Sequence, residues 1–465
     1  HPEEIIVAVA HYDVADTTKE GAMDDASGVG VVLELARIFA ERESERTIIF
    51  LLTDSEEYGA FWGANAFVKS YEKIGQVVAV ENFDFVSPEK QTGILTLCDG
   101  LKSGHTPLWL REIALNSIRS LNLVQALDLT GIMEAIERAL QIPAADHGIF
   151  LAAGIPAFNW VGQTDNFPHV MKHYHHTLAD TAEAIRPESM EPFGKAAERV
   201  INTINELPKL PGNFRDDFYW KLSDRYYLPG WSALCIQILL FLPFVFYTIA
   251  SVQSLVLVRK RDRFIRVAKN ESKNVGIVLG SLLLGYAIML LLPILGVITQ
   301  YEVFPATQKS LILNSPNFGA IFIVIASITF TFSIFRKSFN HKNDSIEDFE
   351  VRHAVHTLFL FLIILLAFLK NSYLAVLLLL PPAYFWTSLN FKHHRRSRFI
   401  NGLLVLLGSV TFVAMTAVMT TVFHVGVFYW YIFLAASYGL FSIYAVVLFI
   451  VSISLMIRMF RSILS

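Results

Sequence analysis

Residues 5–41 of this chain read IIVAVAHYDVADTTKEGAMDDASGVGVVLELARIFAE and contain a strand, two polar clusters and a helix. The continuous apolar run Ile5–Ala10 predicts a strand that is buried on both faces. Residues 28–41 space their apolar side chains as one face of an amphipathic helix does. A buried strand that leads into a helix is typical of an α/β domain, and the polar residues between them lie where such domains bind ligands.

The same alternation continues along the first half of the chain and predicts a mostly parallel sheet flanked by helices. Further strands and helices are expected at Thr47–Leu52, Trp62–Tyr71, Val77–Val80, Ile155–Val161 and Gly194–Leu207. The pattern between Gly100 and Gln141 is less regular, and mixed helix is expected there. Only ten residues precede His11, so we expect the upstream part of the domain to lie outside this sequence.

Composition divides the chain into an acidic first part and a basic, apolar second part. Of its 465 residues, 54% are hydrophobic and 17% are charged, which excludes disordered, collagen-like and disulfide-rich chains. Residues 1–210 hold 16 Lys and Arg against 31 Asp and Glu, whereas residues 211–465 hold 22 against 10. This contrast predicts a soluble head, residues 1–210, fused to a membrane domain. We expect a lipid bilayer as partner and no nucleic acid.

Apolar stretches without charge fill the second part, after a linker at residues 211–231 whose aromatic side chains are typical of a membrane interface. The stretches lie at roughly 232–258, 275–299, 316–335, 353–369, 371–391, 400–423 and 426–457. About 20 apolar residues cross the roughly 30 Å of bilayer hydrocarbon. Residues 232–465 are therefore expected to form about seven transmembrane helices.

The loops after the first, third and fifth stretches are rich in Lys and Arg, and the alternate loops are not. Basic loops stay in the cytoplasm, so the C-terminus is predicted to be cytoplasmic and the head to lie outside the cytoplasm. No stretch carries Asp, Glu, Lys or Arg at its middle, and His356, near the end of the fourth, is interpreted as structural. The tail therefore shows no sign of transport chemistry.

Polar residues follow the first three predicted strands of the head: His11-Tyr12-Asp13, residues 54–57 and residues 81–84. The carboxyl ends of parallel strands meet at one edge, so these groups are expected to converge. Asp24 opens the first helix, and a run of histidines ends at His176. Imidazole nitrogens and carboxylate oxygens suit zinc, and two metals that share a carboxylate can activate water for hydrolysis.

In chain order, His-x-Asp, Asp-Asp-Ala-Ser-Gly, Glu-Glu-x-Gly, Asn-x-Asp and His-Thr-x-x-Asp-Thr resemble the dizinc aminopeptidases of peptidase clan MH. The resemblance covers about residues 4–205, and the family also holds glutaminyl cyclases and aminopeptidase Y. It implies a phosphorylase/hydrolase-like α/β sandwich, here followed by an all-α membrane domain. In architecture the tail is similar to that of membrane-embedded relatives such as endoplasmic reticulum metallopeptidase and vacuolar membrane protease.

The resemblance implies two zinc ions per chain held by five ligands: His11, Asp24, Glu57, Asp84 and His176. Asp24 would bridge the metals, His11 and Asp84 would complete one, and Glu57 and His176 the other. Glu56 would be the general base, and Asp13 would orient the His11 imidazole from behind.

Several neighbouring residues are weaker candidates. Asp25 is interpreted as a helix-start residue, and His176 is preferred to His175 because it directly precedes Thr-x-x-Asp-Thr. Asp146-His147 is left open between a pocket-lining role and structural hydrogen bonding. His105 has no motif around it and is expected on the surface.

The sequence thus predicts a membrane-anchored zinc exopeptidase that removes N-terminal residues from peptides with a free α-amine. A glutaminyl cyclase with one metal, and an inactive membrane receptor or scaffold, remain alternatives. The same ligands could also hold cobalt or manganese. The preferred side chain at the cleaved residue and the oligomeric state are left open.

Overall fold

The computed structural model describes residues 1–15, 18–57, 61–88, 91–100, 104–141, 145–164, 174–211, 218–257, 261–298, 317–334 and 346–388, and a few positions between 400 and 437. Contacts divide the chain into two compact units. The first contains residues 1–233, and the second contains most of the remainder.

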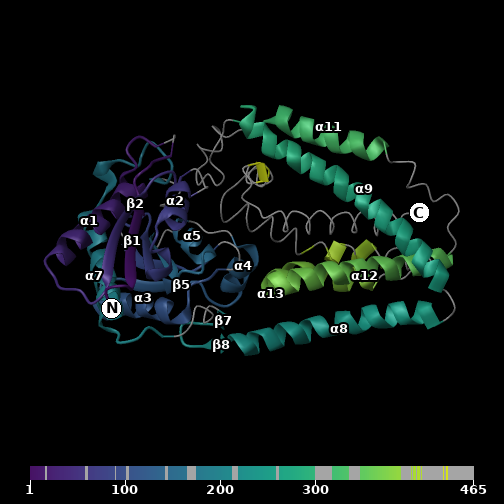
Figure 1. Cartoon of the computed structure of the whole chain (residues 1–465), viewed down its shortest axis with the longest axis horizontal. Helices are drawn as coiled ribbons and strands as arrows, with labels where there is room; N and C mark the ends of the chain where they lie inside the picture. The colour runs from purple at the N-terminus through teal and green to yellow at the C-terminus, as the bar shows by residue number, and fades with distance from the viewer. Residues whose placement is uncertain are drawn as a thin grey trace. The chain divides into compact units, whose positions relative to one another are not determined.

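A sheet forms the centre of the head (Figure 1). It has six strands in the order β2-β1-β3-β6-β4-β5. The strands are β1 Ile5–His11, β2 Thr47–Thr53, β3 Val77–Phe83, β4 Gln91–Leu97, β5 Gln125–Asp128 and β6 Ala157–Thr164. Every neighbouring pair is parallel except β4 and β6, which run antiparallel. The mostly parallel α/β fold expected from the sequence is confirmed.

Helices cover both faces of this sheet: α1 Ser27–Ala40, α2 Trp62–Ser70, α3 Leu108–Leu121, α4 Ile132–Leu140, α5 His147–Ala152 and α7 Pro187–Glu206. Alternate residues of a strand point to opposite faces. In β1, Ile6 and Ala8 accordingly pack in the core with α1, α3 and α7, whereas Val7 and Val9 pack in the core with α2 and α5. This two-sided burial explains the continuous apolar run.

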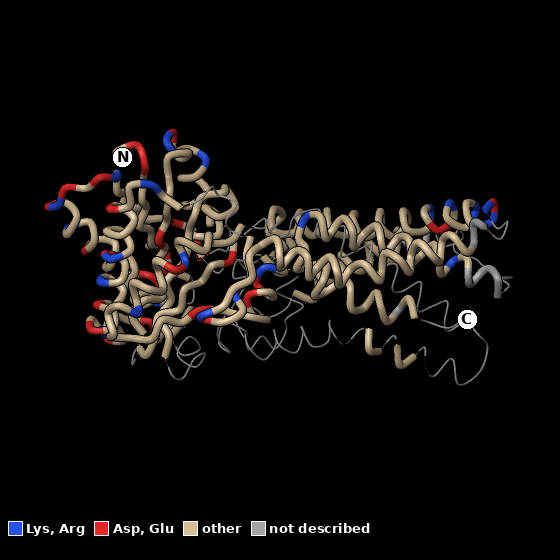
Figure 2. The backbone as a smooth tube through the Cα atoms, turned by 90° about the horizontal axis from the view of Figure 1, so that it is seen from below, with Lys and Arg blue, Asp and Glu red and all other residues tan. Residues whose placement is uncertain are grey.

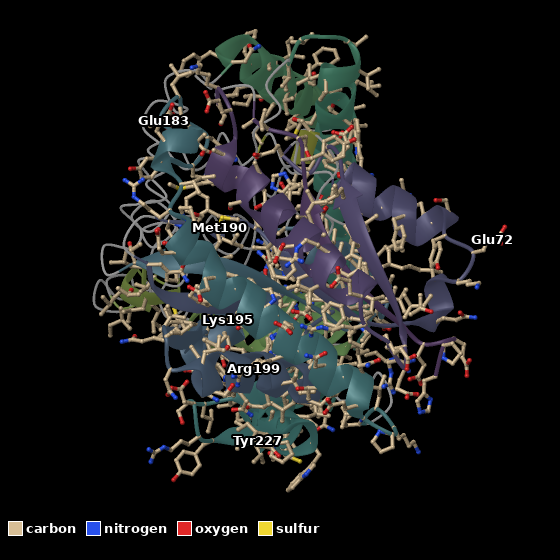
Figure 3. All side chains as sticks on the ribbon, turned by 90° about the vertical axis from the view of Figure 1, so that its left-hand side faces the viewer. Glu72, Glu183, Met190, Lys195, Arg199 and Tyr227 are labelled. Carbon is tan, nitrogen blue, oxygen red and sulfur yellow. The ribbon has the colours of Figure 1, made fainter. Side chains whose placement is uncertain are left out.

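Helix α7 shows how the sequence pattern separates a core face from a solvent face. It begins at Pro187, whose fixed φ suits the first helical turn. Ala196 and Val200 are buried in the core, while Lys195 and Arg199 lie on the exposed face, as Figure 3 shows. The helix therefore closes one side of the sheet and leaves a charged surface outside.

The structure corrects the predicted extent of some strands. β3 continues to Phe83 because its buried polar residues have partners on β6: Glu81 accepts a hydrogen bond from Trp160 Nε1 (3.1 Å), and Asn82 donates one to Asn159 (2.9 Å). β5 lies inside the region expected to be mixed helix. Its four residues are too few to give a period-two pattern.

Part of the predicted linker forms a small hairpin that packs on the head. Its strands are β7 Tyr219–Lys221 and β8 Tyr227–Pro229. Lys221 Nζ lies 2.8 Å from a carboxylate oxygen of Asp128 and 2.7 Å from one of Glu112. The Tyr219 hydroxyl donates a hydrogen bond to the Thr106 carbonyl (3.1 Å). Buried polar contacts thus hold this segment to the head.

The described part of the tail is helical: α8 Gly230–Leu257, α9 Arg261–Ile294, α11 Phe318–Ile334, α12 Ile346–Lys370, α13 Ser372–Leu374, a π-helical turn Ala375–Leu379 and α14 Leu380–Thr387. Among described residues, three helical segments are long and apolar enough to cross a membrane: Gly230–Ser254, Arg261–Ile294 and Val351–Lys370. Two shorter apolar helices accompany them, and Figure 2 shows few charges along most of the tail helices. Most of the last two predicted stretches lies outside the described residues, so the count of seven stays a prediction.

Helix α9 differs from the expected loop and span. It begins at Arg261 and includes most of the basic segment that was expected to be a loop. Its 34 residues measure about 51 Å at 1.5 Å per residue, more than the roughly 30 Å of a bilayer core, which allows its charged first part to extend beyond the lipid. His356 is not a lone histidine, because its Nε2 lies 2.9 Å from the buried Glu271 of α9.

Candidate metal centre

The end of β1 brings three predicted ligands together. His11 is the last residue of β1, Asp84 follows β3, and Asp24 lies in the turn before α1. His11 Nε2 is 3.4 Å from Asp24 Oδ1 and 3.9 Å from Asp84 Oδ1. One ligand atom from each residue lies within 4.8 Å of the others. This group has the nitrogen and oxygen donors of a zinc site.

A second group forms on the other oxygen of the same carboxylate. His175 Nε2 and His176 Nε2 lie 3.3 and 3.5 Å from Asp24 Oδ2, and His176 Nε2 is 2.6 Å from Glu57 Oε2. Asp24, His175 and His176 also satisfy the 4.8 Å grouping. Asp24 therefore presents one oxygen to each group, which is the arrangement that a bridging carboxylate requires.

The spacing of the donors fits metal ligands. Two ligands about 2.0–2.2 Å from one tetrahedral zinc are roughly 3.3 Å apart. The distances from His11, His175 and His176 to Asp24 are close to that value. The distance between His176 and Glu57, 2.6 Å, is shorter, and that between His11 and Asp84, 3.9 Å, is longer. Within the described chain, His11 Nε2, Asp24 Oδ2 and Glu57 Oε1 are buried without a hydrogen-bond partner. Buried polar atoms are normally paired, so these atoms fit a bound cation.

Asp13 supports the site in two ways. Its backbone carbonyl lies 3.1 Å from His11 Nδ1, which directs Nε2 toward the metal position. Its side-chain oxygen Oδ1 is farther from that nitrogen, at 3.5 Å. The carboxylate instead accepts hydrogen bonds from the backbone N–H groups of Glu56 and Glu57, both at 3.1 Å. Sequence reasoning missed this second contact, because no local pattern indicates it.

Asp180 holds the bridging residue, a role that sequence reasoning did not assign. Its carboxylate accepts hydrogen bonds from the backbone N–H groups of Met23 (2.6 Å) and Asp24 (3.2 Å). Burial raises the pKa of Asp180 to about 6, although these hydrogen bonds oppose the effect. Its place in the same His-Thr-x-x-Asp-Thr motif as His176 was the available signal.

Asp25 lies beside the site and is a member of neither group of donors. Its Oδ1 accepts hydrogen bonds from the backbone N–H of Gly28 (3.0 Å), in the first turn of α1, and of Phe85 (3.3 Å). A side chain on Gly28 would overlap this carboxylate, since an added Cβ would lie 2.4 Å from Oδ2. The Asp25 contact is the one expected of a helix-start residue.

Three residues with strained backbone lie beside the two groups of donors. Ser55, Phe85 and His176 are non-glycine residues with φ values of 61°, 56° and 55°. Ser55 precedes Glu56, Phe85 follows Asp84, and His176 is itself in the second group. Such left-handed residues cost about 1–3 kcal/mol each and cluster at functional sites. The local strain supports a functional role for this edge of the sheet.

The acidic side chains of the site carry strongly shifted pKa values. Burial first, and then the charges of Asp84 and Glu57, hold the pKa of Glu56 well above its usual range against the opposing effect of His11. Burial also raises the pKa of Glu57 to about 7, although His176 lowers it. A carboxylate with a pKa raised toward neutral pH can act as a proton acceptor and donor.

Asp24 differs from these residues because the histidines surround it. Burial alone would raise its pKa, but His175, His11 and His176 together hold that pKa well below the usual range. Asp24 therefore stays ionised at the centre of the cluster. An ionised carboxylate is the form that coordinates metal.

Asp146-His147 and His105 lie deeper in the head. Asp146 accepts a hydrogen bond from Thr53 Oγ1 (2.5 Å), and burial raises its pKa to about 6. His147 is fully buried, 3.9 Å from Asp99. The expectation that His105 is on the surface was wrong: it is 4% exposed, and its ring packs edge-on against Tyr219. Tyr219 of the hairpin covers the His105 ring, a contact that the local sequence does not indicate.

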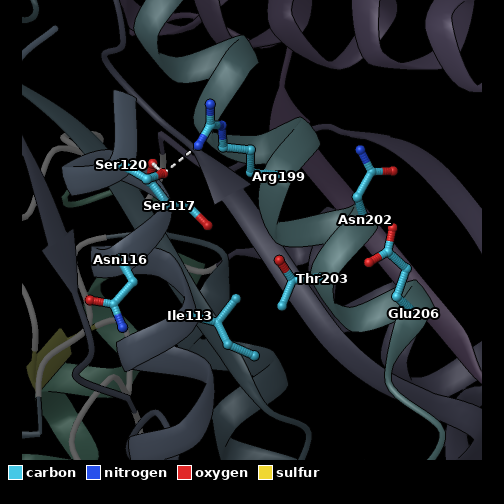
Figure 4. Close-up of a pocket in the computed structure, with 8 residues that line it drawn as sticks. All are labelled: Ile113, Asn116, Ser117, Ser120, Arg199, Asn202, Thr203 and Glu206. Atoms are coloured by element: carbon cyan, nitrogen blue, oxygen red, sulfur yellow. Dashed lines mark hydrogen bonds between the residues drawn. The ribbon is translucent and has the colours of Figure 1, made fainter. Parts of the chain in front are cut away.

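A separate hollow of about 390 Å³ lies between α3 and α7 (Figure 4). Its lining residues are Ile113, Asn116, Ser117, Ser120, Arg199, Asn202, Thr203 and Glu206. Arg199 Nη1 donates a hydrogen bond across it to Ser120 Oγ (2.6 Å). These residues include no histidine and a single carboxylate, so the hollow lacks the donor set of the metal centre.

Comparisons with known proteins agree with this donor set. Residues 1–201 match peptidase family M28. A probable zinc metalloprotease of Leptosphaeria maculans is 27% identical over 250 residues, which are 46% of this chain and 57% of that protein. Aminopeptidase YwaD of Bacillus subtilis is 25% identical over 226 residues, 48% of this chain and 46% of its own.

A vacuolar membrane protease of Candida albicans is 39% identical over 74 residues, 16% of this chain and 9% of that protein. The chain thus spans less than two thirds of the length of each of these relatives. The family match, together with the zinc proteases among the relatives, confirms the resemblance drawn from the motifs. The head of this chain thus matches peptidase family M28 over residues 1–201, and the relatives that it resembles include zinc metalloproteases and a bacterial aminopeptidase.

Proposed function

We propose that the chain is a membrane-anchored aminopeptidase that hydrolyses N-terminal residues of peptides at a two-zinc centre. The observation that carries this proposal is the position of Asp24, whose two oxygens face separate groups of donors. A shared carboxylate of this kind suits two metals rather than one, which favours a hydrolase over a glutaminyl cyclase.

The residues would divide between the two metals as follows. His11, Asp24 and Asp84 would hold one zinc, and Asp24, Glu57 and His176 the other. Bound zinc supplies Lewis-acid polarisation of the scissile carbonyl and a water of lowered pKa.

Glu56 is the proposed general base. Its carboxylate accepts the proton of the attacking water and delivers it to the amine that leaves. Two features support this role: the side chain is buried at the site, and this burial holds its pKa above the usual range of a glutamate. Asp13 keeps the Glu56–Glu57 turn in place through its two backbone contacts.

The free α-amine of a peptide is the proposed recognition group. The head carries 31 acidic against 16 basic residues over residues 1–210, and several of the acids converge at the centre. A positively charged amine is attracted to such a field.

We further propose a multi-pass membrane protein with the peptidase domain outside the cytoplasm, in a periplasmic, extracellular or lumenal space. Residues 1–210 would form the peptidase domain, 211–231 the linker, and 232–465 a membrane domain of about seven helices with a cytoplasmic C-terminus. Three candidate spans and the basic loops of alternate connections support this arrangement.

The test uses the full chain purified in detergent, a panel of aminoacyl-fluorophore substrates and measured zinc content. Wild type should release fluorophore and bind about two zinc ions, and E56Q should lose activity by a factor of about 10²–10⁴ while keeping the metal. One bound metal with pyroglutamate formed from N-terminal Gln peptides would favour the cyclase. A folded wild type that binds no zinc would refute the enzyme and leave the scaffold.

A further inference from the structure

Helix α4 of the head turns charged side chains inward and apolar side chains outward. Glu134 and Arg138 are buried, and Arg138 Nε lies 2.8 Å from Glu134 Oε1. On the outer side, Ile132, Met133 and Ile136 are 59%, 45% and 36% exposed. A surface helix normally does the reverse and places its apolar stripe against the core. The outer side of α4 is therefore an apolar surface that the described head does not cover.

The hairpin of β7 and β8 shows the same inversion. On one face, Tyr219 and Lys221 make buried polar contacts with the head. Successive strand residues alternate between faces, and residues paired across antiparallel strands share a face. Trp220 pairs with Leu228, so these two side chains lie on the other face, and Leu222, directly after β7, is 41% exposed. The outer face of the hairpin is therefore apolar as well.

The two apolar faces meet at Gly131, the residue before α4. Trp220 Nε1 donates a hydrogen bond to the Gly131 carbonyl (2.8 Å), and the Gly131 N–H donates one to the Lys221 carbonyl (2.7 Å). A Cβ added to Gly131 would lie 3.4 Å from the Leu222 carbonyl oxygen. The two faces thus form one surface, called here the α4–hairpin patch: Ile132, Met133, Ile136, Trp220, Leu222 and Leu228. Single exposed apolar residues are ordinary, but a contiguous patch marks an interaction site.

The place of this patch in the chain indicates that lipid covers it. β8 ends at Pro229, and the candidate span Gly230–Ser254 begins at the next residue (Figure 1). Leu228 is two residues from that start, which is at most about 7 Å of extended chain. Trp231, in the first turn of the span, is 72% exposed, and tryptophan is enriched where bilayers meet water. Where the span enters the bilayer, the patch is therefore within reach of the same interface.

We propose that the α4–hairpin patch inserts into the interfacial layer of the bilayer and fixes the orientation of the peptidase domain on the membrane. This inference rests on the membrane anchoring in the proposed function. Apolar surfaces of this kind enter about 5–10 Å into the boundary between headgroups and acyl chains. The exposed charges of the hairpin turn, Asp224 and Arg225, stay among the headgroups. Because Tyr219 and Lys221 tie the hairpin to the head, lipid contact of the hairpin orients the whole domain.

The experiment uses the full chain in phosphatidylcholine nanodiscs, with one introduced cysteine at a time carrying the environment-sensitive fluorophore NBD. Every variant also carries C235S, because Cys235 is exposed whereas Cys98 is buried. M133C and I136C report on the patch. L33C is the matched control, since Leu33 is an aliphatic residue on α1 that is 55% exposed. Fluorescence is compared with and without phosphatidylcholine that carries a doxyl quencher on its acyl chain.

A label at W231C reports on the start of the candidate span and so tests the anchoring by itself. W231C, M133C and I136C should each lose about half of their emission or more to the doxyl lipid, and L33C less than about a tenth, because only the first three labels lie in the interfacial layer. Quenching of W231C alone would overturn the inference and leave the anchoring intact. Blue-shifted emission of M133C and I136C that the doxyl lipid does not quench would mean that protein covers the patch, which also overturns it. An unquenched W231C would overturn the proposed anchoring and the inference with it.

Discussion

Asp13 gives the sharpest test of how the site is held, because its carboxylate makes two equivalent contacts. Both oxygens accept a backbone N–H, one from Glu56 and one from Glu57, at 3.1 Å. In D13N, one oxygen keeps its contact and the amide nitrogen faces the other N–H as a second donor. A hydrogen bond to a charged group contributes about 1.5–3 kcal/mol. If the loss falls on the transition state, kcat/KM should drop about 10- to 150-fold.

The assay measures kcat/KM on an aminoacyl-fluorophore substrate at saturating zinc, with the metal content and the melting temperature of each variant. D54N is the matched control, since Asp54 is exposed and its side chain accepts a hydrogen bond from the N–H of the adjacent Ser55 (2.9 Å). Surface changes of this kind stay within about 0.5 kcal/mol, or roughly twofold. If D13N is as active as D54N with both metals bound, the Asp13 carboxylate does not position Glu56, and the reasoning fails.

Three further predictions concern stability, metal and charge. R46M should lower the free energy of unfolding, measured by denaturant titration, by about 2–4 kcal/mol. The reason is that the buried Arg46 binds Glu4 and three carbonyls at the end of α7. The control R42M, which removes an exposed ion pair with Glu198, should lower the free energy of unfolding by less than about 1 kcal/mol. Chelation of zinc should lower the melting temperature of wild type, since a ligand present at 100 times its Kd stabilises by about 2.7 kcal/mol, and an unchanged transition would mean that no metal was bound. Raising the salt concentration should increase KM for short peptides without changing kcat, because exposed charges are screened; a constant KM would rule out long-range attraction of the amine by the acidic head.

Local sequence patterns predicted much of the fold of the head. The apolar runs of β1, β2 and β3 predicted strands because each is covered by a helix layer on both sides. The polar residues that follow β1 and β3 could then be expected at one edge, and the structure brings His11 and Asp84 within 3.9 Å. The parts that depend on contacts between distant segments could not be found in this way.

Asp180 is the clearest of these, because its contact with Asp24 joins residues 156 positions apart. No periodicity connects the two, and only their common presence in a set of motifs suggested any relation. The burial of His105 is of the same kind, since Tyr219, which packs against its ring, lies in a segment predicted to be a linker. Burial that depends on a remote segment leaves no trace in the local sequence.

The preference for His176 over His175 stays a prediction, and the structure places both histidines beside Asp24 for a reason of backbone geometry. Successive side chains point to opposite faces in a strand and diverge by about 100° in a helix, so two neighbouring side chains in regular structure do not reach the same atom. His176 has a φ of 55°. This left-handed conformation departs from both regular geometries, and the two rings stack on the same side and face the same oxygen of Asp24. A residue other than glycine adopts that φ only where its surroundings hold it there, and the contact of His176 Nε2 with Glu57 Oε2 (2.6 Å) is one such constraint.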